Sequence, residues 1–76
     1  MIEEHSSVVL TEPLPAAGLE AGDVGVVVHV HRDGEAFEVE FMTLKGETVA
    51  VVSLSVEQVR PIAANELPHV RDFEAA

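Results

Sequence analysis

The sequence contains no cysteine, tyrosine or tryptophan, and each absence excludes a class of structure or site. Without cysteine there is no disulfide framework, no thiol nucleophile and no cysteine-ligated zinc centre. Without tyrosine and tryptophan there is no exposed aromatic surface of the kind on which SH3 domains bind polyproline ligands. Stacking of nucleic-acid bases on aromatic side chains is disfavoured for the same reason.

Basic residues are also scarce, since 14 acidic residues stand against 4 basic ones and give a formal charge of −10. Nucleic-acid binding depends on a basic surface that releases counterions from phosphates. An RNA-binding barrel of the KOW type is therefore the least favoured function. An acidic surface promotes solubility, and it also suits a basic protein partner.

Long apolar runs are missing as well. The longest apolar stretch, residues 24–30, is interrupted by Gly25 and His29 and is far shorter than the roughly 20 residues that span a bilayer. The acidic start of the chain, residues 1–5, does not have the pattern of a signal peptide. We therefore expect a cytoplasmic protein without membrane association, and the 76 residues predict a single domain.

Alternating valines and turn-forming residues predict an all-β fold. A first strand over residues 6–11 ends before two prolines, and a second over residues 24–31 alternates valine with other residues. Asp33-Gly34 favours a two-residue type I′ turn, and Lys45-Gly46 indicates another, followed by a strand over residues 48–54. The strand over residues 24–31, the strand between the two turns and the strand over residues 48–54 form a predicted antiparallel meander.

The two turns together set one strand register. The first places Val30 opposite Phe37, with the alternation continuing along both strands. The second places Phe37 opposite Leu54. One face of the meander is then apolar and forms the predicted core, with these pairs: Val30 and Phe37, Val28 and Val39, Val26 and Phe41, Phe41 and Ala50, Val39 and Val52, Phe37 and Leu54.

The segment after the meander predicts a short helical turn and a last strand. Ser55 and Gln58 have capping-box spacing, but Pro61 leaves room for only one turn, of 3-10 type. Residues 59–62 then form an edge strand. This order predicts a small, strongly bent, five-stranded SH3-like barrel over residues 1–62. Residues 63–76 form an acidic tail, either disordered or a short helix beginning at Pro68.

Several sequence elements resemble a bacterial family of unknown function, DUF4926. They are the Ala-Gly-Asp-Val-Gly run at residues 21–25, the Glu-Val-Glu-Phe run at residues 38–41 and the Gln-Val-Arg-Pro run at residues 58–61. The resemblance extends over about residues 6–62 and implies a small barrel without established catalytic residues. It also suggests, by analogy, an antitoxin-like, immunity-like or mobile-cassette protein. Gly25 would let a neighbouring strand pass closely where the sheet bends.

No catalytic group emerges from the pattern, and we expect no enzymatic activity and no cofactor. A nucleophile would need an adjacent base and donors for an oxyanion, and the sequence offers no such arrangement. His29 and His31 project from one face of a strand, with Glu38 across the hairpin. They are weak candidates for a metal site, which makes a small metal-binding or regulatory accessory domain the alternative function. A cross-strand His and Glu pair is the simpler interpretation.

The same register predicts an apolar patch on the outer face of the meander. Clustered apolar side chains on a small domain are typical of an interface, although the tail could cover part of them. We therefore expect a protein-binding module whose partner is a second copy, as a dimer, or a basic, toxin-like protein. The candidate interface residues are Val27, Met42, Val49 and Val51 in the sheet and Leu67, Val70 and Phe73 in the tail.

Overall fold

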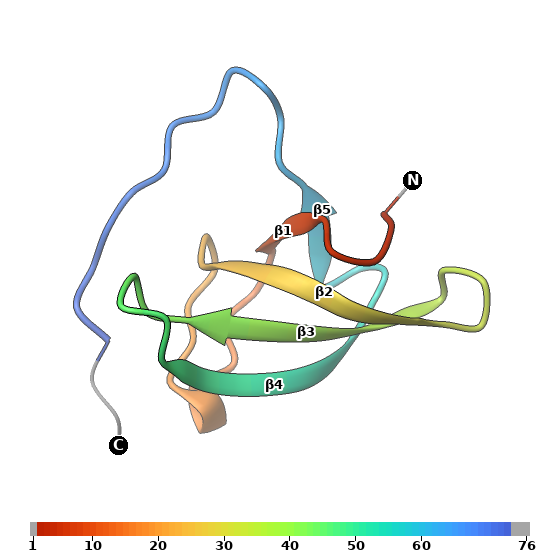
Figure 1. Cartoon of the computed structure of the whole chain (residues 1–76), viewed down its shortest axis with the longest axis horizontal. Helices are drawn as coiled ribbons and strands as arrows, with labels where there is room; N and C mark the ends of the chain where they lie inside the picture. The colour runs from red at the N-terminus through yellow and green to blue at the C-terminus, as the bar shows by residue number, and fades with distance from the viewer. Residues whose placement is uncertain (1, 74–76) are drawn as a thin grey trace.

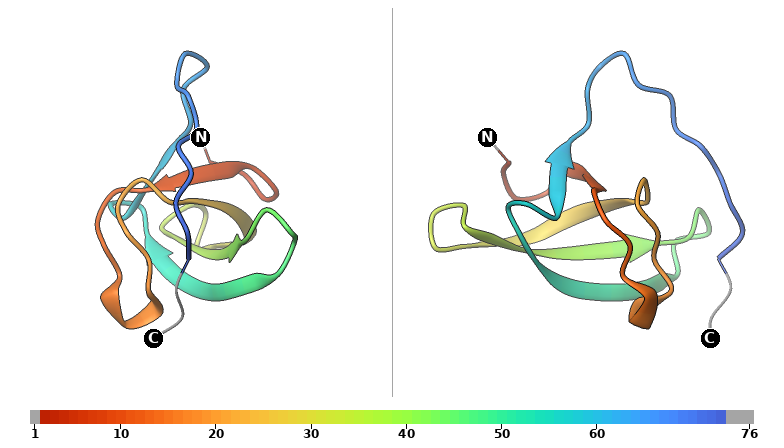
Figure 2. Two further views of the ribbon diagram at one scale, coloured as in Figure 1. Left: turned by 90° about the vertical axis from the view of Figure 1, so that its left-hand side faces the viewer. Right: turned by 180° about the vertical axis from the view of Figure 1, so that it is seen from behind.

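The computed structural model describes residues 2–73, which form one strongly curled antiparallel sheet (Figures 1 and 2). The strand order is β4-β3-β2-β1-β5, so β4 and β5 are the two edges of a sheet that does not close. The all-β class and the bent, barrel-like, five-stranded architecture are confirmed, and an SH3-like barrel is compatible with them. In chain order the elements are β1 (Ser7–Leu10), the 3-10 helix η1 (Pro15–Ala17), β2 (Val24–His31), β3 (Ala36–Met42), β4 (Thr48–Ser55) and β5 (Val59–Pro61).

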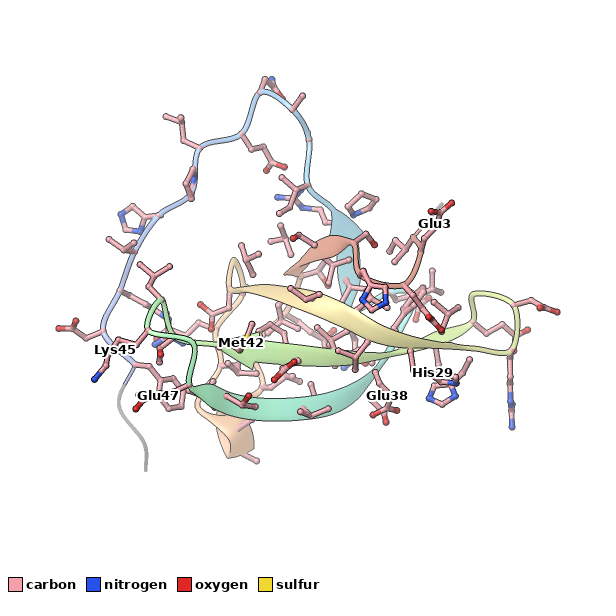
Figure 3. All side chains as sticks on the ribbon, in the orientation of Figure 1. Glu3, His29, Glu38, Met42, Lys45 and Glu47 are labelled. Atoms are coloured by element: carbon pink, nitrogen blue, oxygen red, sulfur yellow. The ribbon has the colours of Figure 1, made fainter. Side chains whose placement is uncertain are left out.

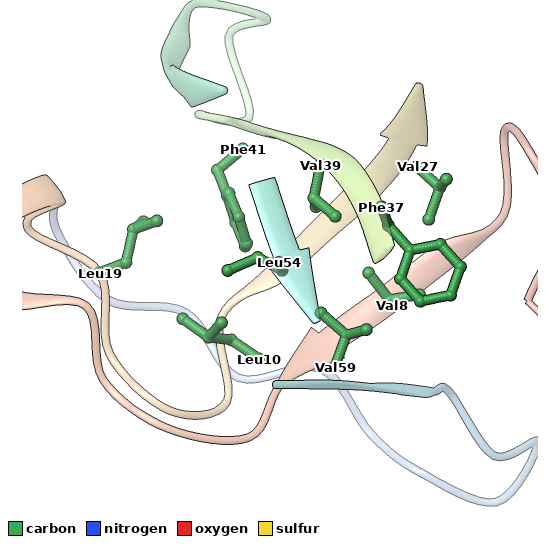
Figure 4. Packing of buried hydrophobic residues seen from close by; sticks show 9 residues of the cluster. All are labelled: Val8, Leu10, Leu19, Val27, Phe37, Val39, Phe41, Leu54 and Val59. Atoms are coloured by element: carbon green, nitrogen blue, oxygen red, sulfur yellow. The ribbon is translucent and has the colours of Figure 1, made fainter. Parts of the chain in front are cut away.

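The concave side of the sheet encloses the hydrophobic core (Figure 4). The alternate β3 residues Phe37, Val39 and Phe41 are buried, as the sequence predicts, because successive side chains of a strand point to opposite faces. They pack against Leu54 of β4 and against residues from the other elements. The remaining buried members of the cluster are Val8, Leu10, Leu19, Val27 and Val59.

The predicted register of β3 with β4 is confirmed, with Phe37 opposite Leu54. The turn between them begins earlier than predicted. The Gly46 N–H donates to the Thr43 carbonyl at 2.9 Å, so Leu44 and Lys45 are its central residues. Gly46, with φ of +92°, takes the left-handed conformation that follows such a turn.

The register of β2 with β3 is correct near the hairpin tip and wrong beyond it. Val30 lies opposite Phe37 as predicted, but a β-bulge between Val27 and His29 places Val27, and not Val28, opposite Val39. A bulge adds one residue to a strand and reverses which side chains face inward. Val27 is therefore fully buried, whereas Val28 is 39% exposed.

The hairpin tip is longer than the predicted two-residue turn at Asp33-Gly34. The last strand pair is His31 with Ala36, and the Gly34 N–H donates to the His31 carbonyl at 3.0 Å. Arg32 and Asp33 are thus the central residues, and both have positive φ, 49° and 57°. Aspartate tolerates this left-handed region better than most residues, which helps the turn to form one position early.

The 3-10 helix lies between β1 and β2 and not before the last strand. Residues 55–58 form a hydrogen-bonded turn in which the Gln58 N–H donates to the Ser55 carbonyl at 3.0 Å. The side-chain Oε1 of Gln58 accepts from the Ser55 N–H at 2.9 Å, so the predicted capping contact forms without a helix. β5 follows as an edge strand containing Pro61, as predicted.

The tail leaves β5 and returns along the opposite end of the sheet (Figures 1 and 2). Residues 63–73 contain no helix, so the prediction of a helix beginning at Pro68 is wrong for this part; residues 74–76 of the tail lie outside the described residues. Within residues 2–73, no helix has the length and apolar character needed to cross a membrane.

Candidate functional site

His29, His31 and Glu38 cluster on the outer face of the hairpin. Figure 3 labels His29 and Glu38 there. The contact with Glu38 is made by His31, whose Nε2 lies 2.9 Å from Oε2 of the carboxylate. His29, directly opposite Glu38 in the register, instead packs edge-on against His31 at 4.6 Å between ring centroids. The Ser53 hydroxyl donates to the same Glu38 oxygen. This bond, followed by the His31 contact, lowers the pKa of Glu38 below its ordinary value.

This cluster is a hydrogen-bond network and does not have the geometry of a metal centre. The Nε2 atom of His31 and the Oε2 atom of Glu38, which would be ligands, already bind each other. His29 has its Nδ1 atom 3.6 Å from the Glu4 carboxylate. In residues 2–73, no three or more His, Asp or Glu side chains are placed to hold one ion. The metal-binding alternative therefore stays a prediction from the sequence pattern.

The residues of the predicted apolar patch do not all lie on one exposed surface in the structure. Val27 is buried in the core, so the prediction that it lies on the outer face is wrong, and the bulge is the reason. Val49 and Phe73 are half-buried and pack against the core. Four of the predicted residues are exposed: Met42, Val51, Leu67 and Val70.

A cleft of about 1000 Å³ lies between residues 68–73 of the tail and the adjoining ends of β2 and β3, and we call it the tail cleft. Met42 of β3 and Val70 of the tail both line it. Sequence reasoning missed two other exposed apolar residues in its lining, Val24 and Leu44. Leu44 was hidden by the turn prediction, which placed the turn one position too late.

Arg71 attaches the tail to the body of the domain at this cleft. Its guanidinium donates to both oxygens of Asp23, at 3.0 and 2.6 Å, and to the Gly18 carbonyl at 3.1 Å. The hydrogen bond from Arg71 is the main cause that lowers the pKa of Asp23. Two-pronged contacts of this kind are more directional than single ion pairs, so Arg71 fixes where the tail passes the end of the sheet.

Arg60 makes a second paired contact where the tail begins. It donates to the two carboxylate oxygens of Glu66 at 2.8 and 2.6 Å, and the Ala63 N–H donates to the same carboxylate at 2.7 Å. Together these contacts lower the pKa of Glu66 from 4.5 to about 2, with the Arg60 hydrogen bond as the largest cause. The first bend of the tail is therefore organised around an ionised Glu66.

We expect the attachment of this bend to weaken in acid. Because the Glu66 pKa is lowered in the folded state, its stabilising contribution is complete above about pH 4.5 and is lost as the pH falls toward 2. An NMR titration of the Glu66 carboxyl and the Ala63 amide should give a midpoint near 2. Arg60→Gln should raise that midpoint toward 4.5, and a midpoint already near 4.5 in the unchanged chain would contradict the contact.

A second hollow, of about 550 Å³, lies between η1 and β4, and we call it the β4 groove. The 3-10 helix lies beside this edge of the sheet in both Figure 1 and Figure 2. Val51, another predicted interface residue, lines it and is 53% exposed. The lining residues are Leu14, Pro15, Ala16 and Ala17 on one side and Val51, Val52, Ser53, Leu54 and Gln58 on the other.

In the comparison with known proteins, the chain matches a family model described as a domain of unknown function, DUF4926, over residues 4–61. The match spans more than half of the chain and includes all five strands. Neither the curated proteins nor the solved structures provide a significant match.

Proposed function

Because the chain belongs to DUF4926, a family whose function is unknown, we propose a role from the surface of the domain. The proposed role is that of a non-enzymatic, cytoplasmic protein-binding module whose partner is a basic protein. The observation that carries this proposal is the tail cleft. Its rim presents Val24, Met42, Leu44 and Val70, all solvent-exposed. Apolar side chains gathered at a hollow of a small domain are typical of a surface that a partner covers.

The charge distribution defines the chemistry of the partner. Two of the four basic residues, Arg60 and Arg71, bind carboxylates of the same chain. Within residues 2–73 no charged side chain is buried, so the acidic excess faces the solvent, where it attracts a basic surface and accelerates association. The same excess disfavours association of two copies, each with a charge of −10.

Co-expression with the product of a neighbouring gene tests this proposal. We expect a basic product to co-purify with the chain, and Met42→Glu combined with Val70→Glu to reduce the retained amount at least about tenfold by placing charges in the apolar contact. Val56→Glu is the matched control, because Val56 is 54% exposed, between Met42 at 45% and Val70 at 72%, and lies outside the lining of the tail cleft.

Three outcomes would count against the proposal. A monomer that retains neither the neighbouring product nor any basic protein would contradict a binding role. Retention that survives both substitutions would exclude the tail cleft as the contact. A dimer mass by sedimentation, abolished by the same two substitutions, would assign the cleft to a second copy instead.

A further inference from the structure

The β4 strand is an unprotected sheet edge. Within residues 2–73 it pairs with β3 alone, and its eight residues, Thr48–Ser55, include no charged residue and no proline. Natural edge strands are usually kept from pairing by shortness, charge, proline or a cover. The other edge has three of these protections, since β5 has three residues and includes Arg60 and Pro61.

The β4 groove gives this edge an apolar floor. An added strand would lie between β4 and η1, beside Leu14 and Ala17 on one side and Val52 and Leu54 on the other. Alternate side chains of that strand would point toward this floor. The groove therefore selects small or β-branched apolar residues at every second position.

The convex face beside the edge has the opposite character. Glu40 and Glu38 of β3 lie opposite Val51 and Ser53 of β4. A strand added outside β4 would lie two strand spacings, roughly 10 Å, from β3, which carries these carboxylates. A lysine side chain of the added strand and a glutamate side chain of β3 can together span that distance. Glu38 is only partly exposed and already binds Ser53 and His31, whereas an exposed glutamate lies near each end of β4, Glu47 and Glu57. The outward positions of an added strand would thus favour lysine or arginine.

We propose that β4 accepts an extended segment of a basic protein as a sixth strand, in which apolar residues facing the groove alternate with lysine or arginine facing the solvent. Main-chain hydrogen bonds would supply affinity, and the two faces would supply specificity. The inference goes beyond the proposed function, because the β4 groove and the tail cleft have no lining residue in common.

A second copy of the chain fits this edge less well. Two β4 strands paired antiparallel about a twofold axis would bring Glu47 of each copy toward Glu57 of the other. Like charges in such positions are destabilising, and a total charge of −20 opposes the approach of the two copies. The carboxylates of Glu47 and Glu57 would instead attract the lysine or arginine side chains of a basic strand.

A synthetic peptide tests the inference. The probe has eight residues, valine alternating with lysine, with both termini capped. We expect it to shift the amide NMR signals of residues 48–55 in the full chain. Two further peptides carry N-methyl groups, either on the valines or on the lysines. Only one edge of the peptide can pair with β4, so one N-methylated form should bind about tenfold more weakly or worse while the other binds like the parent.

Two variants of the protein distinguish binding at the β4 edge from attraction by the overall negative charge. Val51→Lys places a cation on the β4 edge and should weaken binding of the parent peptide about fivefold or more. Val28→Lys makes the same change at an exposed valine of β2 outside both hollows and should leave binding within about twofold. Retained dispersion of the amide spectrum shows that both variants are folded.

The inference is overturned if both N-methylated peptides bind equally, or if the two lysine variants weaken binding alike, since the attraction is then only electrostatic. Peptide-induced shifts at residues 42–46 and 68–73 would move the peptide to the tail cleft, which overturns the edge inference and supports the proposed function. A concentration-dependent dimer whose β4 amides are already protected would make a second copy the occupant of the edge.

Discussion

Replacing Phe37 with alanine is expected to remove most of the stability of the domain. The side chain is fully buried and belongs to the core cluster (Figure 4). Truncating a buried phenylalanine typically lowers the free energy of unfolding by about 3–5 kcal/mol. A chain of 76 residues has a total of about 4–11 kcal/mol, at roughly 0.05–0.15 kcal/mol per residue.

Urea unfolding followed by far-ultraviolet circular dichroism measures this loss, since the chain has no tryptophan to report by fluorescence. The matched control is Val51→Ala on the exposed side of β4, which should change stability by no more than about 0.5 kcal/mol. A loss below about 1 kcal/mol for Phe37→Ala would mean that this ring is not enclosed as described.

Replacing Gly25 with alanine is the second large effect expected. A methyl group at this position would lie 2.6 Å from Cγ1 of Val39, 2.9 Å from Cε1 of Phe41 and 3.0 Å from the Glu40 carbonyl oxygen. The nearest atom belongs to a short, buried side chain and the third to the backbone, so relief requires the sheet to shift. Overpacking of this kind costs about 1–3 kcal/mol.

The sign of the change makes this prediction informative. An alanine that fitted without strain would stabilise the domain by about 0.4–1 kcal/mol, because it restricts the unfolded chain. We expect instead a loss, measured by the same urea unfolding. In a Val39→Ala background the cost of Gly25→Ala should be smaller, because the closest contact is gone. Equal costs in both backgrounds, or a gain in stability, would contradict the close approach of β2 to β3.

The parts of the fold that could be read from the sequence are those where local pattern and tertiary packing agree. The β3 run alternates Phe37, Val39 and Phe41 with glutamates, so only one register buries the apolar side chains. The close approach at Gly25 also followed from the pattern, because a glycine within a run of valines indicates a neighbouring backbone or side chain nearby.

The bulge in β2 could not be read from the sequence. Residues 26–28 are all valine, so a shift of one position leaves the hydrophobic pattern unchanged and gives no local sign of which valine faces inward. The packing between β2 and β3 makes that choice, and it moved Val27 from the predicted interface to the core. Candidate surface residues in a uniform apolar strand are for this reason less predictable than the core of β3.

The two hollows depended on contacts distant in sequence. Arg71 binds Asp23 across 48 positions, and η1 and β4 line one hollow with residues more than 30 positions apart. Neither arrangement leaves a periodic signal. The exposed edge of β4 could be recognised only after the strand order was known, because the same uncharged run would be unremarkable in a central strand.

The most direct test of the unpaired β4 edge is residue-resolved hydrogen exchange of the isolated chain. The measurement is made at a concentration where sedimentation shows a monomer. Amides of β3 have strand partners on both sides and should all exchange slowly, whereas in β4 slow and fast amides should alternate along residues 48–55, with the fast set facing solvent. Uniformly slow exchange throughout β4 in the monomer would mean that this edge is already paired or covered, and would contradict the account.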